Sequence, residues 1–360
     1  MNEYEVTDFF SDKKTYRHER RRASRLDRSK YKKTDQEKRP AEPSGMQHLK
    51  KGVVVHIQGP EILVDHEGSF IPCTLRGVLK KDKSLFKNLV VVGDVVCFSE
   101  DGAIHHIEER KSVLSRAAHL SQQQEHLLAA NVDQVLITVS VVDPPLRPTI
   151  IDRYLIAAQK GGLNAVILCN KMDLLEDPTY NGEGRAHEKT LMHEVQAIYQ
   201  AINIPFIPLS TVTKEGLDQL IEIMKDKTSV FSGQSGCGKS SLINATCAME
   251  LKVGKTVARS KKGAHTTSFA RLIKLPFGGY VVDTPGIKSF GIWNIGVREL
   301  PALFPEIQAA AGDCKYQDCS HTGEDGCAIP DAIHTQKVSM LRYESYLNIF
   351  GSLQQEHLRR

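Results

Sequence analysis

Residues 233–240 read Gly-Gln-Ser-Gly-Cys-Gly-Lys-Ser, the G-x-x-x-x-G-K-[ST] pattern of a phosphate-binding loop. The apolar run 229–233 precedes the loop, and the helical stretch 240–246 (SSLINAT) follows it. In this context backbone N–H groups surround a β-phosphate, Lys239 reaches the β- and γ-phosphates, and the Ser240 hydroxyl binds Mg²⁺. The predicted nucleotide-binding residues of the loop are Gly233, Gln234, Ser235, Gly236, Cys237, Gly238, Lys239, Ser240 and Ser241.

A second motif selects the base. Asn170-Lys171-Met172-Asp173 comes directly after the apolar run 164–169. The Asp173 carboxylate can accept hydrogen bonds from guanine N1–H and the 2-amino group, whereas adenine offers neither and leaves the charge unpaired. Such a site can reject the wrong partner by about 10⁴-fold. Because Ser210 follows the next apolar run, where a backbone amide would meet guanine O6, we expect GTP, bound by Asn170, Lys171, Asp173 and Ser210.

Two further segments suit the metal ion and the γ-phosphate. Asp283-Thr284-Pro285-Gly286 follows the apolar YVV, so that Asp283 would hold Mg²⁺ through water and the Gly286 amide would sense the γ-phosphate. Residues 262–267 (KGAHTT) predict a switch loop in which a threonine binds Mg²⁺. Either Thr266 or Thr267 suits this role.

The order of these motifs is rotated. Ordinary GTPases run from the phosphate loop through the switch threonine and D-x-x-G to N-K-x-D, whereas this chain begins with Asn170 and ends with Gly286. The same sheet forms if the usual termini are joined and new ones are cut after the D-x-x-G strand, because domain termini often lie close together. Alternating buried strands and helices predict an α/β domain with a parallel sheet. The strands are expected at 133–142, 164–170, 205–210, 229–233 and 280–282, and the helices at 148–160, at 191–202 and from Lys239.

Short strands precede this domain. Five β-prone runs between Lys51 and Arg110 are separated by turn residues such as Gly59-Pro60. This spacing predicts a small β-barrel of the oligonucleotide-binding (OB) type. A purely structural barrel and one that binds RNA are equally consistent with the residues. Residues 115–131 have a helical pattern and are expected to link the barrel to the α/β domain.

A cluster of metal-ligand residues lies near the C-terminus. Cys314, Cys319, His321 and Cys327 offer three thiols and an imidazole, enough for a closed tetrahedral zinc site. The 8 cysteines of the chain are too scattered for a disulfide scaffold, and in a reducing compartment clustered cysteines favour metal, with free thiols as the alternative. An apolar-periodic helix is expected after this cluster, around 338–350.

The composition, 41% hydrophobic and 25% charged, is typical of a soluble globular protein. No stretch approaches the roughly 18 apolar residues that span a bilayer. The N-terminal MNEYEVTDFF does not resemble a signal peptide, so we expect a cytoplasmic protein with no membrane partner. Residues 1–50 contain 14 Lys and Arg against 9 Asp and Glu, and we expect 1–48 to be a disordered basic tail. It is either a solvated tail or an arm that neutralises nucleic-acid phosphates.

The motifs and their order resemble the RsgA family of circularly permuted GTPases, which act on the small ribosomal subunit. The resemblance covers about residues 50–350. It implies an OB-type barrel at 49–112, a permuted P-loop GTPase domain at 113–293 and a zinc-binding, mainly helical domain at 294–360. The family's zinc pattern matches Cys314, Cys319, His321 and Cys327. Family members usually read Glu-Pro-Gly before the last cysteine, whereas residues 324–326 here read Glu-Asp-Gly.

The residues around the γ-phosphate indicate slow intrinsic turnover. Ras-like enzymes place a Gln just after D-x-x-G to orient the attacking water, and Ile287 occupies that position here. We therefore expect slow hydrolysis alone and strong activation by a bound partner. The resemblance implies that His265 positions the water while Lys239 binds the phosphates. A His265 that only packs or contacts RNA is the alternative.

The resemblance also implies a biological role. It predicts a GTPase that binds the small ribosomal subunit and its rRNA and hydrolyses GTP to GDP and phosphate as a checkpoint in late subunit maturation. The implied cofactors are Mg²⁺ with GTP and one structural zinc ion. The alternatives are a GTPase acting on another ribosomal target, and an RNA-binding scaffold with a structural nucleotide. Intact Lys239, Ser240 and Asp283 favour turnover, and the lack of a long heptad pattern favours a monomer.

Overall fold

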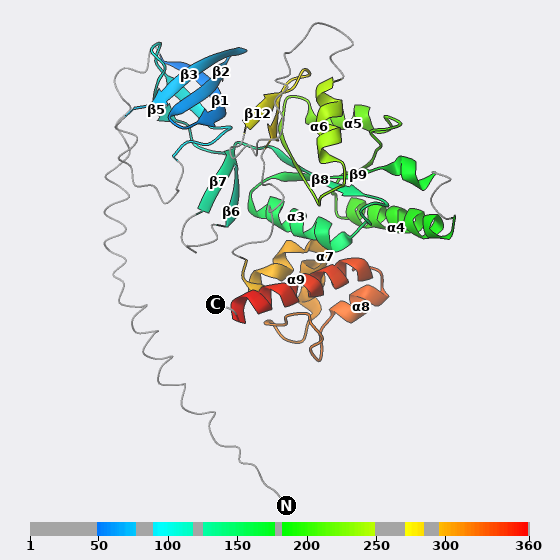
Figure 1. The fold of residues 1–360 in the computed structure, drawn as a ribbon. Coiled ribbons are helices and arrows are strands. Elements are labelled where there is room, and N and C mark those ends of the chain that lie inside the picture. The colour runs from blue at the N-terminus through cyan, green and yellow to red at the C-terminus, as the bar shows by residue number, and fades with distance from the viewer. Residues whose placement is uncertain are drawn as a thin grey trace, which may run out of the picture. The chain divides into compact units, whose positions relative to one another are not determined.

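Five strands close into a barrel at the start of the described chain (Figure 1). The computed structural model describes residues 49–76, 89–117, 125–176, 182–248, 271–283 and 295–358. Neighbouring strands pair in the order β1-β2-β3-β5-β4, and β4 returns to β1, which confirms the predicted OB-type barrel. Val54, Val64 and Phe98 are buried in its core. The strands are β1 (Lys50–Gln58), β2 (Glu61–His66), β3 (Ser69–Leu75), β4 (Val95–Phe98) and β5 (Ala103–Ile107).

The linker after the barrel is a β-hairpin, so the helix expected at 115–131 is wrong. Strands β6 (Val113–Ala117) and β7 (Glu125–Ala130) pair antiparallel. Leu127 and Ala129, two residues apart on β7, are both buried, as the two-residue period of a strand requires. The Ala130 amide also donates to the Val92 carbonyl of the barrel at 2.9 Å. Packing against the barrel therefore overrides the local helical pattern.

The predicted parallel sheet is present. Its strands lie in the order β10-β9-β8-β11-β13-β12, and only β12 runs antiparallel to its neighbour. All seven residues of β8 are buried, including the polar Gln134, Thr138 and Ser140, which explains the mainly apolar sequence of this strand. Strand β12 was not among the predicted strands. The strands are β8 (Gln134–Ser140), β9 (Asn164–Asn170), β10 (Phe206–Pro208), β11 (Thr228–Ser232), β12 (Arg271–Lys274) and β13 (Tyr280–Asp283).

Helices cover both faces of this sheet (Figure 1). Helices α3 (Pro148–Lys160) and α4 (Gly182–Ala201) pack on one face, and α5 (Leu217–Met224) and α6 (Lys239–Ala248) pack on the other. Helix α3 starts at a proline and ends at Gly161-Gly162, as predicted. Helix α4 begins nine residues before the predicted 191. A short 3₁₀ turn, η3 (Met172–Leu175), follows β9.

The C-terminal helices share a core with α3. This core joins Ile156 of α3 to Phe304, Tyr346 and Ile349. The helix predicted at 338–350 is confirmed as α9, which continues to Leu358. None of the helices among the described residues is long and apolar enough to cross a membrane. The C-terminal elements are η6 (Val297–Leu303), α7 (Pro305–Ala310), η7 (Ala311–Asp313), α8 (Ile329–His334) and α9 (Met340–Leu358).

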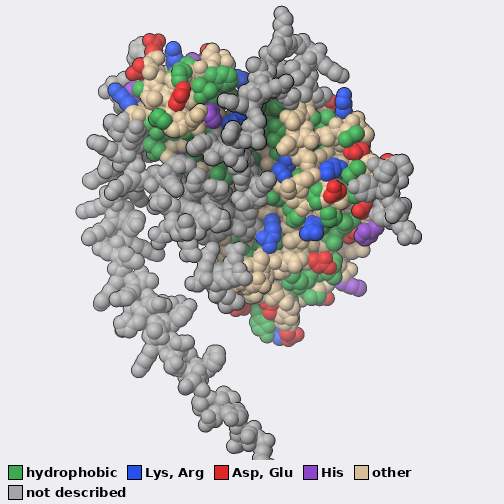
Figure 2. Space-filling model, viewed as in Figure 1, with side chains coloured by type: hydrophobic (Ala, Val, Ile, Leu, Met, Phe, Trp, Pro, Cys, Tyr) green, Lys and Arg blue, Asp and Glu red, His purple; other side chains and the backbone are tan. Residues whose placement is uncertain are grey.

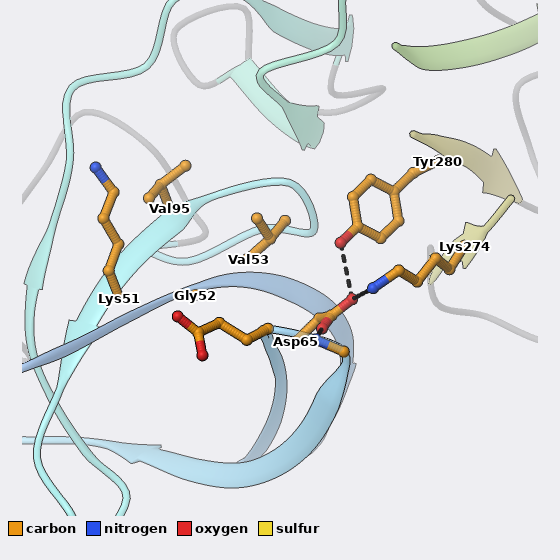
Figure 3. A pocket seen from close by; sticks show the side chains of 9 residues that line it. Lys51, Gly52, Val53, Asp65, Val95, Lys274 and Tyr280 are labelled. Atoms are coloured by element: carbon orange, nitrogen blue, oxygen red, sulfur yellow. Dashed lines mark hydrogen bonds and ion pairs between the residues drawn. The ribbon is translucent and has the colours of Figure 1, made fainter. Parts of the chain in front are cut away.

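The barrel and the parallel sheet meet at β1 and β12. One residue pair, His56 and Arg271, connects these strands, so that 11 strands form a continuous sheet. A cavity of about 450 Å³ lies at this junction (Figure 3). Its lining residues are Lys51, Gly52, Val53, Asp65, Glu67, Gly68, Val95, Lys274 and Tyr280.

Candidate nucleotide and metal sites

The predicted guanine-binding residues lie together after β9 and β10. Lys171 adopts a left-handed backbone (φ 67°) directly before η3, which places Asp173 in the first turn of η3. The Ser210 hydroxyl donates to Asp173 Oδ1 at 2.5 Å and accepts from the amides of Val212 and Thr213. The Ser210 amide donates to the Glu215 carbonyl at 3.0 Å.

The predicted phosphate loop follows β11. Gly233 (φ 145°) and Gly238 (φ 95°) have backbones that side chains rarely adopt. A Cβ atom on Gly233 would lie 2.0 Å from the Thr138 carbonyl oxygen, and one on Gly238 would lie 2.1 Å from Asn170 Nδ2. These contacts explain why both positions are glycine. Lys239 Nζ donates to the carbonyls of Gly233 at 2.8 Å and Gln234 at 2.6 Å.

A direct hydrogen bond joins the two motifs. Asn170 Nδ2 donates to the Cys237 carbonyl at 2.9 Å. Asn170 is buried, and its Oδ1 atom has no hydrogen-bond partner within the described part of the chain. The thiol of Cys237 is buried and donates to the Gln234 carbonyl at 3.0 Å. Because burial raises the pKa of this thiol, it stays protonated, in agreement with a role for the backbone rather than for the sulfur at this position.

Asp283 ends β13, which runs parallel to β11. The carboxyl ends of both strands therefore lie at the same edge of the sheet, beside the phosphate loop. Arg271, directly opposite on β12, donates to Asp283 Oδ2 through Nε at 2.9 Å and through Nη2 at 2.8 Å. Oδ1 has no partner among the described residues, which leaves a carboxylate oxygen of the kind that Mg²⁺ prefers. The remaining predicted residues, His265, Thr266, Thr267, Gly286 and Ile287, lie outside the described residues.

The four predicted zinc ligands converge. Their ligand atoms all lie within 4.8 Å of one another. His321 Nδ1 is 3.5 Å from Cys314 Sγ and 3.7 Å from Cys327 Sγ. Tetrahedral zinc with its usual bond lengths separates sulfur and nitrogen ligands by about 3.6 Å. The donor set and its spacing therefore fit zinc.

Glu324 organises the loop that carries His321, a role that sequence reasoning missed. Its carboxylate accepts the amides of Ser320 and Thr322, each at 2.7 Å, and the Ser320 hydroxyl. Burial opposes the charge of Glu324, but these hydrogen bonds outweigh burial and lower its pKa to about 2. From α9, Tyr343 donates to the His321 carbonyl at 3.0 Å. This network holds the turn without the proline that the family usually has.

Comparison with known proteins decides the family. The RsgA GTPase family model matches residues 107–293. The chain belongs to the RsgA GTPase family. It is therefore a P-loop GTP hydrolase.

The relatives extend over most of the chain. A protein of Flavobacterium psychrophilum named "Small ribosomal subunit biogenesis GTPase RsgA" is 37% identical over 79% of this chain and 86% of its own length. A protein of the same name from Bacteroides fragilis (strain ATCC 25285) is 35% identical over 83% of this chain and 96% of its own length.

Two solved structures share the architecture. YjeQ from Thermotoga maritima matches with a TM-score of 0.67 and 32% identity, covering 85% of this chain and 99% of that chain. YloQ, described as a circularly permuted GTPase, matches with a TM-score of 0.67 and 26% identity, covering 88% of this chain and 99% of that chain. This chain therefore has the circularly permuted GTPase fold, with a barrel before it and helices with a Cys₃His cluster after it.

Proposed function

We propose that this protein binds the small ribosomal subunit and hydrolyses GTP to GDP and phosphate as a checkpoint in late subunit maturation. The relatives' names supply the target. The observation that carries the proposal is the contact of Asn170 with Cys237, because it joins the guanine motif to the phosphate loop in one site. The Ser210–Asp173 hydrogen bond supports the same site at its guanine end.

The residues have distinct proposed roles. The Asp173 carboxylate accepts from guanine N1–H and the 2-amino group, and the amides of 233–241 surround the phosphates. Lys239, which now donates to carbonyls of its own loop, turns to the β- and γ-phosphates when the nucleotide binds. Mg²⁺, held by Ser240, Asp283 and Thr266 or Thr267, would neutralise charge that develops on the γ-phosphate.

We propose that the bound subunit stimulates turnover. The Ile287 side chain cannot hydrogen-bond a water molecule, so another residue must orient the water that attacks the γ-phosphate. His265 is the proposed residue. Single-turnover hydrolysis by His265→Ala, measured with and without the subunit, tests this role: a large loss confined to the subunit-stimulated rate supports it, and an unchanged stimulated rate removes His265 from the mechanism.

The RNA-binding surface is proposed to include the barrel and the basic residues of 1–48. On the face shown in Figure 2, Lys and Arg side chains of the described residues are scattered among acidic ones rather than gathered in one block. The basic excess of the sequence lies instead at residues 1–50. Removal of 1–48 should therefore reduce the salt-dependent part of the affinity for RNA. We also propose a cytoplasmic monomer with one structural zinc ion.

Co-sedimentation with separated ribosomal subunits tests the function. The full-length protein should pellet with the small subunit when a non-hydrolysable GTP analogue is bound, and less with GDP. Its GTP turnover should rise with the small subunit and not with the large one. Equal binding to both subunits, or stimulation by the large subunit alone, would contradict the proposal and favour another ribosomal target.

A further inference from the structure

A buried carboxylate of the barrel contacts the β12–β13 hairpin. Asp65 of β2 is 4% exposed and accepts hydrogen bonds from Lys274 Nζ and the Tyr280 hydroxyl, each at 2.8 Å, and from the Gly68 amide at 2.9 Å. Figure 3 shows Lys274 and Tyr280 reaching Asp65 from the hairpin across the junction. A carboxylate with this many donors is strongly held, because charge-assisted hydrogen bonds are about twice as strong as neutral ones.

The other end of the same hairpin carries Asp283. Lys274 is paired with Tyr280 in the strand register, and Arg271 is paired with Asp283. Tyr280 and Asp283 begin and end β13, so about 10 Å of extended strand separates them. The hairpin therefore runs from a barrel contact at one end to the proposed Mg²⁺ carboxylate at the other.

At the other end of the hairpin, the ion pair between Arg271 and Asp283 is weak by itself. The side chains of Arg271 and Asp283 are 50% and 39% exposed, and ion pairs in that setting contribute about 0–1 kcal/mol. Among the described residues, His56 and Arg271 are the one ladder pair between β1 and β12. The Asp65 contact adds a buried polar contact to the apolar packing of Val55 against Leu272 and Val282 at this junction.

We propose that Asp65 is a positioning residue for GTP hydrolysis, which acts through Lys274 and Tyr280 on the β12–β13 hairpin and thereby sets the position of the Asp283 carboxylate. This inference rests on the proposed role of Asp283 at Mg²⁺. It gives the barrel a part in the reaction, because a partner that displaces β2 displaces the hairpin with it. A displacement of about 1 Å at a reacting group can cost about 10²-fold in rate.

The test is a Mg²⁺ titration of GTP hydrolysis at saturating GTP, with the full-length protein. Tyr280→Phe and Lys274→Met each remove one donor and keep Asp65, while Asp65→Asn weakens both contacts. Each variant should require about three- to tenfold more Mg²⁺ for half-maximal rate and should lower kcat. The affinity for GDP in EDTA should stay unchanged, because Asp283 acts only through the metal.

Two designs separate positioning from general loosening. Asp94→Asn removes another buried barrel carboxylate, which pairs with Arg110 at 2.7 Å and touches no hairpin residue; it should lower stability and leave the Mg²⁺ requirement unchanged. The double variant, Lys274→Met with Asp65→Asn, should require little more Mg²⁺ than either single variant, because both changes break the same contact. The exchanged pair, Asp65→Lys with Lys274→Asp, should recover part of the Mg²⁺ response.

The outcomes distinguish this inference from the proposed function. Folded Tyr280→Phe and Lys274→Met proteins with wild-type Mg²⁺ curves would overturn it, as would an equal effect of Asp94→Asn. In either case Asp283→Asn should still abolish the Mg²⁺-dependent rate, so the proposed function stands. If the wild-type rate did not depend on Mg²⁺, or Asp283→Asn kept it, the role of Asp283 and this inference would both fail.

Discussion

At the scale of single residues, we propose that Asp173 selects the base. Its Oδ1 atom accepts from Ser210, and its position after the left-handed Lys171 is fixed by the backbone. A carboxylate accepts hydrogen bonds only, and guanine presents two donors on the edge it would meet. On this proposal, specificity for guanine rests on one side chain and its orientation.

Asp173→Asn should change the base preference. The Asn amide supplies a donor, which suits the carbonyl that xanthine carries where guanine has its 2-amino group. We expect GTP affinity to fall by about 5- to 150-fold, with recovery for xanthosine triphosphate, because a buried polar group left unpaired costs about 1–3 kcal/mol. Competition with a fluorescent GDP analogue measures both affinities. Asp218→Asn on α5 is the control, and unchanged GTP affinity of Asp173→Asn would exclude this role for Asp173.

The charge on Asp65 makes the barrel–hairpin junction sensitive to acid. Burial opposes this charge, but the hydrogen bonds from Lys274 and Tyr280 outweigh burial and hold the pKa below its ordinary value of 3.8. A carboxylate whose pKa is lowered by folding contributes its full stabilisation at a pH above its pKa in the unfolded protein. This contribution is lost as the pH falls through its pKa in the folded protein. The difference in free energy of unfolding between wild type and Asp65→Asn should thus be largest at neutral pH and shrink below about pH 4. Denaturant titrations at several pH values measure it, and a difference that grows in acid would contradict the assignment.

At the scale of elements, the zinc loop depends on Glu324 as well as on its four ligands. Glu324→Gln should weaken zinc binding by about 10–100-fold, the usual effect of losing a group that orients a ligand. Competition with a chromophoric chelator measures the affinity. The neighbouring Asp325→Asn is a matched control, because the Asp325 side chain is 97% exposed. Equal affinities of the two variants would show that Glu324 does not organise the site.

Element prediction succeeded where the signal was local. The barrel strands and β8, β9 and β11 each read as short apolar runs between turn residues, and the burial of every residue of β8 produces such a run. The 115–131 segment failed because Leu127 and Ala129 are buried by contacts with distant residues, which a local helical pattern cannot reveal. Strand β12 was missed because its four residues, Arg-Leu-Ile-Lys, include two charged ones.

Site prediction had the same limit. The loops that hold Asn170, Asp173 and Lys239 follow spacing rules, so their meeting was predictable. The contacts made by Asp65 and Glu324 were not, because nothing in the spacing of these carboxylates shows which donors the fold brings to them. Side-chain networks between distant segments depend on tertiary structure alone.

At the scale of the whole molecule, one arginine ties the C-terminal helices to the GTPase sheet. Arg342 of α9 is 3% exposed, and it donates to Asp152 of α3 and to Glu306 of α7 at 2.6 Å. Its guanidinium also lies 4.4 Å from the Phe304 ring centroid. Both carboxylates are buried, at 0% and 9% side-chain exposure, so each depends on this single cation.

Arg342→Ala should therefore be costly. It leaves two buried carboxylates without a cation, and breaking a buried ion pair on one side costs about 3–5 kcal/mol. Chemical denaturation should show this loss, and proteolysis should cut the C-terminal helices first. The exposed Arg298→Ala is the control and should change stability by less than about 0.5 kcal/mol. Similar stability of both variants would show that apolar packing alone holds α9 on α3.

The narrow junction between β1 and β12 has a mechanical consequence. Neighbouring strands elsewhere in the 11-stranded sheet share at least two residue pairs, and β8 and β9 share seven, whereas His56 and Arg271 are the single pair between β1 and β12 in the described chain. A force that pulls the barrel away from the GTPase sheet would act on the His56–Arg271 pair and on the Asp65 contact before it acted on β8. The barrel should detach as an intact body, at a lower force than the one that tears the nucleotide-binding sheet, in an optical-trap experiment.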